Sequence, residues 1–353
     1  MRGRPGRLGL LVAGSAVALL LAACGGGGTG GHVGSPTTTS GRPGTTTTVA
    51  STTTTTALTK AAGIWSKPVT IAAGADLSVV SCPVAGFCLA GTMSGQSYRL
   101  AAGRATVIGP VGSAPSPQGG SYLTCTSATF CAAVPNLNQA VLFNGTSWSG
   151  PTTIPAAQGF ESIGCVGTTF CVSIDGEGNS FVFNGTSWSG NVGAWGAANQ
   201  ISCASPTFCV AVEGGPSVWN GHTWTQPTDA DPQGQLNAVS CAGPTFCMAV
   251  DSAGAVLTWN GSTFSAPVSV AQEPPLSGSD ASGLTGVSCP TPTFCRAVDS
   301  LGRVFGFNGI SWSPGEQIDD GHALTGVSCS SASSCVAIDR DGRAIVSGDA
   351  ASS

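Results

Sequence analysis

The sequence predicts an all-β fold made of seven repeated units, each built from four short antiparallel strands. Two observations support this prediction. Only 8% of the residues are charged and the chain has 52 Gly and 22 Pro, a composition typical of strands and turns. Cysteines also pair with five residues between them, and the first members of successive pairs lie 38 to 48 residues apart: Cys82 and Cys88, Cys125 and Cys131, Cys165 and Cys171, Cys203 and Cys209, Cys241 and Cys247, Cys289 and Cys295, and Cys329 and Cys335.

One unit is clearest between Leu284 and Ser313. An apolar run ends at Cys289, a second run begins at Cys295, a third ends before Asn308, and the fourth contains Trp312. Short apolar, β-branched runs separated by turn residues predict strands. We call the four strands of a unit first to fourth, in chain order.

The third and fourth strands are joined by an Asn-Gly pair in five units. Asn-Gly between apolar runs is a strong hairpin signal, because both residues tolerate the positive φ of a type I′ turn. An aromatic residue follows each of these asparagines by four positions: Trp148 after Asn144, Trp188 after Asn184, Trp224 after Asn220, Phe264 after Asn260 and Trp312 after Asn308.

A period near 40 residues with four strands per unit is the signature of a β-propeller, whose units, or blades, are arranged radially. Leucine-rich repeats are shorter, and helical repeats lack this density of Val, Thr and Gly. The chain therefore resembles propeller repeat proteins over residues 61–348. We expect a seven-bladed β-propeller with four-stranded antiparallel blades.

The last unit ends without a fourth strand. Residues 64–71, IWSKPVTI, align with SWSGPTTI at residues 147–154, although they precede the first cysteine pair. We therefore expect this N-terminal segment to be the fourth strand of the seventh blade, which closes the ring and removes an exposed sheet edge. The alternative is that the segment is only a linker.

Fourteen of the 15 cysteines belong to the repeated pairs, and the remaining one is Cys24. Zinc sites usually contain cysteines two to four residues apart, in groups of four and often with His, whereas this chain has only three His. We therefore expect seven disulfides, one within each pair, and no metal. Disulfides indicate an oxidising compartment.

The N-terminus has the organisation of a secretory signal. Residues 1–23 combine a basic start, an apolar segment and small residues before Cys24. The sequence LAAC at 21–24 resembles the lipobox of bacterial lipoproteins, which implies lipidation of Cys24 and an extracytoplasmic protein anchored to the bacterial cell membrane. An ordinary signal peptide is the alternative. Residues 24–60 then form a Gly/Thr/Ser-rich, disordered tether, and 349–353 a C-terminal tail.

The charge excludes some partners. Without Arg2, Arg4 and Arg7, which the signal would remove, 9 basic and 17 acidic residues remain, a net charge near −8. This argues against nucleic acid and against an anionic membrane surface as partners. We expect a monomer whose lipid anchor lies in the membrane, without a cofactor.

The topology of a propeller sorts its loops onto two faces. The disulfide face carries the turns between first and second strands and between third and fourth strands. The acidic face carries the turns between second and third strands and the connections between blades, and its loops vary most. Variable loops on a uniform scaffold favour ligand binding, so the candidate binding residues are Asp175, Glu213, Asp251, Asp299, Asp339 and Trp195. Alternatively the acidic residues only form turns or hold calcium, and Trp195 packs on its own loop.

Two classes of function stay open. The NGTSW segments resemble part of the Asp-box of sialidase-like propellers, and this resemblance implies a glycan-processing enzyme with an arginine cluster and a tyrosine. The available residues are Arg99, Arg303, Arg343 and Tyr98, and no catalytic residue is assigned. The favoured hypothesis is a non-catalytic binding module for a glycan, a peptide or an envelope protein. Convergence of the three arginines in one pocket with a carboxylate and Tyr98 would favour the enzyme, whereas separated, exposed arginines would favour the binding module.

Overall fold

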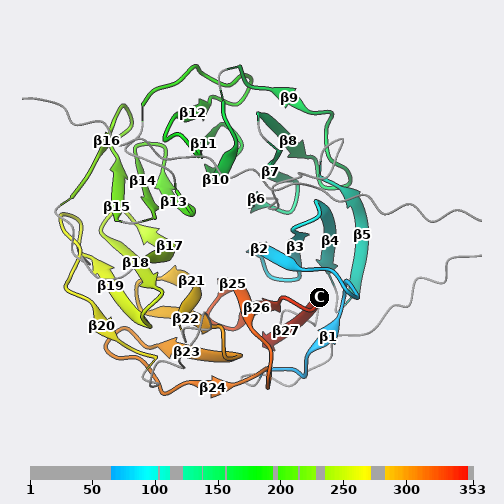
Figure 1. Cartoon of the computed structure of the whole chain (residues 1–353), viewed down its shortest axis with the longest axis vertical. Helices are drawn as coiled ribbons and strands as arrows, with labels where there is room; N and C mark the ends of the chain where they lie inside the picture. The colour runs from blue at the N-terminus through cyan, green and yellow to red at the C-terminus, as the bar shows by residue number, and fades with distance from the viewer. Residues whose placement is uncertain are drawn as a thin grey trace, which may run out of the picture. The chain divides into compact units, whose positions relative to one another are not determined.

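The computed structural model describes residues 65–101, 104–111, 122–136, 138–155, 157–193, 198–213, 215–227, 235–271 and 283–348. These residues form seven antiparallel β-sheets arranged as a ring (Figure 1), so the all-β, seven-bladed fold is confirmed. They contain no helix, and hence none long and apolar enough to cross a bilayer. The segments 1–23, 24–60 with Cys24, and 349–353, as well as Trp195, lie outside the described residues.

Each blade runs from a first strand near the centre of the ring to a last strand at its rim. The strands of blades one to three are β2 (Leu77–Val84), β3 (Phe87–Thr92), β4 (Gln96–Ala101) and β5 (Arg104–Pro110); β6 (Tyr122–Ser127), β7 (Phe130–Asn136), β8 (Gln139–Phe143) and β9 (Thr152–Thr153); and β10 (Phe160–Val166), β11 (Phe170–Asp175) and β12 (Ser180–Phe183).

The same order continues through the second half of the ring. The strands of blades four to seven are β13 (Gln200–Ser205), β14 (Phe208–Val212), β15 (Pro216–Trp219) and β16 (Trp224–Thr225); β17 (Leu236–Gly243), β18 (Phe246–Asp251), β19 (Ala255–Trp259) and β20 (Val268–Ser269); β21 (Leu284–Thr291), β22 (Phe294–Asp299), β23 (Arg303–Phe307) and β24 (Glu316–Gln317); and β25 (Leu324–Ser331), β26 (Ser334–Asp339), β27 (Arg343–Gly348) and β1 (Val69–Thr70).

The outermost position is the least regular. The sheet of blade three has three strands, and the segment after β12 is held by a bridge between Phe183 and Trp188. In blade seven the outermost strand is β1, which pairs antiparallel with β27, while Trp65 forms a bridge with Ser347. The N-terminal end of the described chain thus contributes to the same sheet as its C-terminal end.

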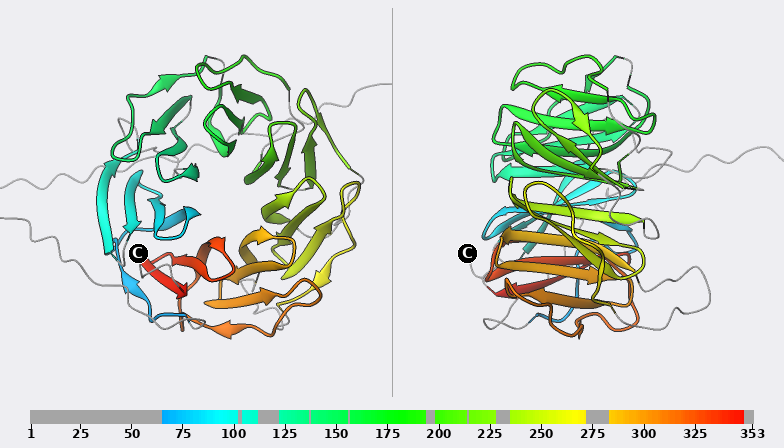
Figure 2. Two further views of the ribbon diagram at one scale, coloured as in Figure 1. Left: turned by 180° about the vertical axis from the view of Figure 1, so that it is seen from behind. Right: turned by 90° about the vertical axis from the view of Figure 1, so that its left-hand side faces the viewer.

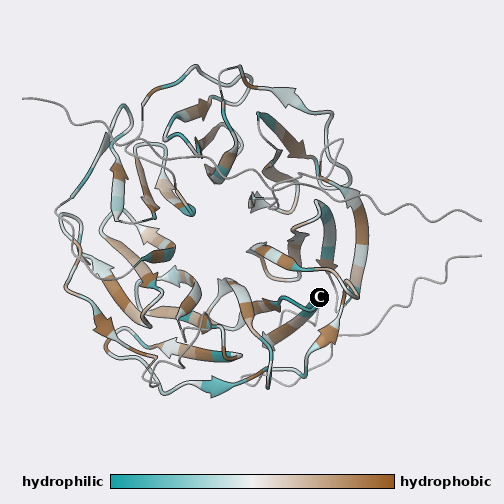
Figure 3. Cartoon of the chain, in the orientation of Figure 1, coloured by the Kyte–Doolittle hydropathy of each residue, from teal (hydrophilic) through white to brown (hydrophobic). Residues whose placement is uncertain are grey.

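The hydrophobic core lies between neighbouring blades. Between blades one and two, for example, Phe87 and Leu89 pack with Leu123, Val141 and Phe143. Figure 3 shows apolar residues along the middle strands of the blades, whereas the rim strand β24 is hydrophilic. Because each blade buries its faces against its two neighbours, the ring is stabilised by blade-to-blade packing.

All seven predicted disulfides are present, each within its own pair and with Cα atoms 4.0 to 4.1 Å apart. They join Cys82 with Cys88, Cys125 with Cys131, Cys165 with Cys171, Cys203 with Cys209, Cys241 with Cys247, Cys289 with Cys295, and Cys329 with Cys335. In five of the blades the two cysteines are direct cross-strand partners. The disulfides therefore lock the first strand of a blade to the second, where the connecting turn is short and polar.

The cysteines of the second strands are part of the core rather than of an accessible site. Each is at most 5% exposed: Cys88, Cys131, Cys171, Cys209, Cys247, Cys295 and Cys335. Because these sulfurs are bonded in disulfides and buried, their role is structural, and they cannot contact a ligand at the surface.

The first strands surround the centre of the ring (Figure 2). Their residues line a cavity of about 320 Å³, which we call the central channel. The residue before the first cysteine links these strands, because in five blades it is a serine whose Oγ accepts the N–H of the next blade's first cysteine at 2.9 Å. These bonds run from Cys82 to Ser328, Cys125 to Ser81, Cys241 to Ser202, Cys289 to Ser240 and Cys329 to Ser288. Small hydroxyl side chains thus hold the inner edge of the ring together.

Candidate functional site

The aspartates of the acidic face are buried turn formers. Asp175, Asp251, Asp299 and Asp339 are at most 1% exposed. In each, Oδ1 accepts the N–H groups of the residues two and four positions later, at 2.6 to 3.1 Å. These carboxylates are occupied by their own turns, so in this conformation they do not face a ligand. The four aspartates thus form turns, as the alternative interpretation expected, and a role for them in ligand binding stays a prediction.

Glu213 is the acidic candidate that stays partly exposed. It lies near Glu161, a residue of the first strand of blade three whose pKa is raised by burial and by the charges of Glu213 and Asp175. The pKa of Tyr122, which lines the central channel, is raised by burial and by Glu161. The sequence did not single out this group, because nothing in the repeat pattern marks Glu161.

The three arginines considered for an enzyme make different contacts. Arg303 Nε donates to Asp299 at 2.7 Å, and Arg343 binds Asp339 and Asp319. Arg99 packs instead over the ring of Phe87, with 5.1 Å from its guanidinium carbon to the ring centroid. These contacts are separate, and none of them joins two of the three arginines.

A mixed group at blade seven was not anticipated from the sequence. His322, Asp339 and Asp341 have ligand atoms within 4.8 Å of one another, and His322 Nδ1 contacts Asp341. The Asp339 carboxylate is however engaged by Arg343 Nε and by two N–H groups of its turn. A metal ion would have to displace these bonds, so the arrangement favours an ion-pair network.

The Asn-Gly turns form on the disulfide face, but with a different closing pair. The N–H of Asn144 donates to Ser147 O at 3.2 Å, which places Gly145, with φ of 98°, first in the turn. The Asn144 side chain accepts the N–H of Thr146 and of Ser147. The asparagine therefore flanks and caps the turn, and the predicted type I′ turn with Asn and Gly at its centre is wrong.

Aromatic rings fill the space between blades at one repeated position. In blades two to six the third-strand residue that pairs with the second cysteine is aromatic, and its ring lies 5.2 to 5.5 Å from the ring of the fourth-strand aromatic. The pairs are Phe143 with Trp148, Phe183 with Trp188, Trp219 with Trp224, Trp259 with Phe264 and Phe307 with Trp312. Three of these rings also meet a phenylalanine of the preceding blade: Phe143 with Phe87, Trp259 with Phe208 and Phe307 with Phe246.

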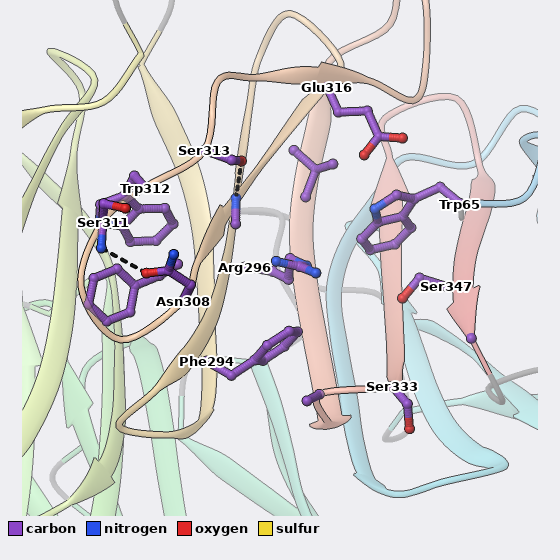
Figure 4. Close-up of a pocket in the computed structure, with 15 residues that line it drawn as sticks. Trp65, Phe294, Arg296, Asn308, Ser311, Trp312, Ser313, Glu316, Ser333 and Ser347 are labelled. Carbon is purple, nitrogen blue, oxygen red and sulfur yellow. Dashed lines mark hydrogen bonds between the residues drawn. The ribbon is translucent and has the colours of Figure 1, made fainter. Parts of the chain in front are cut away.

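Blade seven lacks this ring. Its equivalent residue is Ser347, the register partner of Cys335, and the fourth-strand aromatic beside it is Trp65. Within the described residues Trp65 has no ring partner, and Phe294 of blade six has no ring opposite it. A pocket of about 570 Å³ lies here between blades six and seven, which we call the interblade pocket (Figure 4).

Arginine replaces an apolar residue in the wall of this pocket. Arg296 follows the second cysteine of blade six, where the other blades carry Leu89, Ala132, Val172, Val210, Met248 and Val336. Its cross-strand partner is Gly306, and a Cβ there would overlap Arg296 Nη1. Gly306 thus provides the room for the guanidinium, which lies 4.3 Å from the centroid of Phe294.

The electrostatics of the interblade pocket centre on this side chain. Burial lowers the pKa of Arg296, while the charge of Glu316, an exposed residue on β24, opposes that shift. Figure 4 shows Arg296 between the two blades, with Trp65 and Ser347 on the blade-seven side. Among the described residues, the Arg296 side chain forms no hydrogen bond or ion pair, and its contacts are the ring of Phe294 and the longer-range charge of Glu316. The guanidinium is therefore free to bind an acceptor that enters the pocket.

The sequence contains the signal for this pocket, although our prediction missed it. Aligned on the cysteine pairs, the repeats show Ser347 where five blades have an aromatic residue, and Arg296 where six have an apolar one. The prediction weighted acidic turns instead, which are a common feature of turn chemistry. The positions at which one blade differs from the others, Arg296 and Ser347, therefore indicated the candidate binding pocket better than the acidic turns did.

Several solved propellers resemble the structure. The RRP9 WD40 repeats match with a TM-score of 0.66 and 12% identity over 83% of this chain and 99% of that one. YCF48 bound to D1 peptide matches with a TM-score of 0.63 and 14% identity, again over 83% and 99%. The Pan2 WD40 domain of Neurospora crassa gives a TM-score of 0.61 and 10% identity over 81% and 95%.

At these identities the similarity establishes the β-propeller fold alone. No protein-family model and no curated protein sequence matches the chain. The resemblance to sialidase-like propellers stays a prediction.

Proposed function

We propose that this protein is a non-catalytic binding module, held outside the bacterial cell by a lipid on Cys24, and that the interblade pocket is where its ligand binds. The observation that carries the proposal is the pocket itself, which combines a guanidinium that forms no hydrogen bond within the described residues with Trp65, which has no ring partner there. Its volume of about 570 Å³ is within the range of small-molecule sites.

The ring around the pocket also supports a binding role. Seven disulfides and a repeated inter-blade core make a rigid scaffold, and a rigid site loses little entropy when it binds. One of the similar propellers is bound to D1 peptide, so recognition of a partner has a precedent on this fold. The alternative contacts are the candidates predicted from the sequence: Asp175, Glu213, Asp251, Asp299, Asp339 and Trp195.

The experiment is a binding screen with membrane vesicles that carry the full-length chain, against envelope polysaccharides and peptides. We expect Ser347→Phe to abolish capture of the ligand, because the new ring fills the space that Phe307 fills in blade six. Ser187→Phe is the matched control, since Ser187 is exposed on the disulfide face of blade three. Capture that survives Ser347→Phe, or is lost equally with Ser187→Phe, contradicts the proposed site.

The anchor is tested separately. If Cys24 is lipidated, Cys24→Ala leaves the protein uncut or releases it, and the membrane fraction loses its processed form. A processed Cys24→Ala protein that still sediments with membranes would show that the lipoprotein assignment is wrong.

A further inference from the structure

We infer that the interblade pocket recognises an acidic sugar, a hexuronate-like ring whose carboxylate is held by Arg296. This inference rests on the proposed function and names the class of its ligand. It is carried by three kinds of group in the pocket: one guanidinium, a partly buried aromatic residue that has no ring partner among the described residues, and hydroxyl groups without a hydrogen-bond partner there.

The guanidinium selects the charge of the ligand. Arginine presents several N–H donors in a planar fork that matches the two oxygens of a carboxylate. Arg296 is half-buried, packs on Phe294, and forms no hydrogen bond within the described chain. Blade five holds Met248 at the equivalent position, packed into the core, so the fold itself does not require a charge there.

The aromatic residue and the hydroxyl groups select the shape. Trp65 lines the pocket and lacks the ring partner that Trp312 finds in Phe307. The C–H face of a pyranose ring is flat and apolar enough to cover such an indole face. The hydroxyls of Ser311 and Ser347 also line the pocket and have no partner among the described residues, so they are positioned to bond sugar hydroxyls.

The surroundings favour a sugar over an extended peptide. Peptides often bind by adding a strand to a free sheet edge. At this junction the rim strands β24 and β1 have only two residues each, which is too little edge for such a ladder. A compact ring that carries a carboxylate and several hydroxyls uses the groups present without needing a backbone partner.

Glu316 refines the prediction. Its exposed carboxylate also lines the pocket and interacts with Arg296, so it opposes the entry of a second negative charge. Glu316→Gln should therefore bind an acidic sugar more tightly than the wild type. The same substitution should not affect a neutral sugar.

The test measures binding of D-glucuronate, D-glucuronamide and D-glucose to the full-length chain in detergent, by ligand-observed NMR and calorimetry. Loss of a charge-assisted bond corresponds to about tenfold or more in affinity. We expect glucuronate to bind at least about tenfold more tightly than the amide or glucose, and Arg296→Met to remove that preference. Arg104→Met, at an exposed arginine of β5, is the control and should change nothing.

The outcomes separate this inference from the proposed function. Glucuronate binding that is unchanged in Arg296→Met overturns the inference. The inference is also overturned if N-acetyl-glutamate amide binds, glucuronate does not, and Arg296→Met abolishes that binding. In that case the interblade pocket would still be the binding site, but its ligand would be an acidic peptide. If no carboxylate binds while Ser347→Phe still removes a ligand in the screen, the acidic-sugar inference fails alone. If Ser347→Phe removes nothing, the proposed function fails with it.

Discussion

The junction between blades five and six and the junction between blades six and seven follow the same backbone plan, but they are filled differently. At the first, Phe246, Met248 and Phe307 belong to one apolar cluster. At the second, the equivalent positions hold Phe294, Arg296 and Ser347, and a pocket remains. A pocket of about 710 Å³ also lies at the rim of the first junction, lined by Val268, Arg303 and Ile310. The two junctions therefore differ in whether an aromatic ring occupies the third-strand position, and not in whether a cavity is present.

The same contrast extends to the acidic face. Ala271 follows blade five and carries no charge, whereas the equivalent residue after blade six is Asp319, which binds Arg343 through both oxygens at 2.8 and 2.9 Å. Asp319 is 2% exposed and Arg343 is partly buried. Arg303, the equivalent of Arg343 in blade six, pairs with Asp299. The junction between blades six and seven therefore differs from its neighbour by the additional buried carboxylate of Asp319.

The largest expected effect on stability comes from removing an aromatic ring at the junction between blades five and six. Phe307→Ala removes a ring that contacts both Phe246 and Trp312. Fully buried Phe→Ala changes cost about 3–5 kcal/mol, and because Phe307 is only partly buried we expect about 2–3 kcal/mol of unfolding free energy to be lost. Ser347→Ala is the matched change in blade seven and should stay within about 0.5 kcal/mol. Equal losses in chemical denaturation would contradict the difference between the junctions.

A second effect distinguishes turn formation from ligand binding on the acidic face. Asp299→Ala removes the acceptor for the N–H groups of Leu301 and Arg303 and for Arg303 Nε. We expect it to lower the unfolding free energy by about 1–3 kcal/mol, the cost of leaving buried donors unsatisfied. Ligand capture by the folded fraction should not change. Weaker ligand capture by an Asp299→Ala protein of unchanged stability would show that Asp299 takes part in binding.

A third effect is a change in pH dependence. Burial and a hydrogen bond to Asp339 raise the pKa of Asp319 from 3.8 to about 7, although Arg343 opposes the shift. Because the folded-state pKa lies above the unfolded one, the proton binds the native chain more tightly. The resulting stabilisation is complete below the unfolded pKa and is lost as the pH rises through about 7.

Asp319→Asn tests this, since an amide does not titrate. Denaturation midpoints measured from about pH 4 to 8 should fall with rising pH in the wild type and fall less in the variant. His322→Gln serves as a control for the neighbouring imidazole, which faces Asp341. Parallel curves for the wild type and Asp319→Asn would show that Asp319 does not titrate in this range.

Most of the fold could be predicted from the sequence because each unit repeats the same local signals. The cysteine spacing indicated the disulfides, and the Asn-Gly pairs placed the turns at the right end of each blade. The predicted type I′ conformation of those turns was wrong. The side chain of Asn144 accepts backbone N–H groups of its own turn, and the turn is closed between Asn144 and Ser147. The spacing of the Asn-Gly pairs along the sequence does not show which backbone groups the asparagine side chain will bond.

The site was harder to predict because burial depends on packing between units. Asp175 and Asp339 look available in the sequence, yet each carboxylate is enclosed by its own turn. Arg296 and Ser347 lie 51 positions apart in the sequence and meet only because blades six and seven pack side by side. The interblade pocket exists because Ser347 is smaller than the aromatic residue at the equivalent position of five other blades. It can therefore be recognised only by comparing the blades position by position.

The most direct test of the account measures thermal stability and ligand capture together in Ser347→Phe. Filling the interblade pocket should make this junction resemble the one between blades five and six, so the unfolding free energy should rise by about 0.5–2 kcal/mol while capture is lost. An unchanged or improved capture of ligand by a stably folded Ser347→Phe protein would contradict the claim that this departure from the repeat is the binding site.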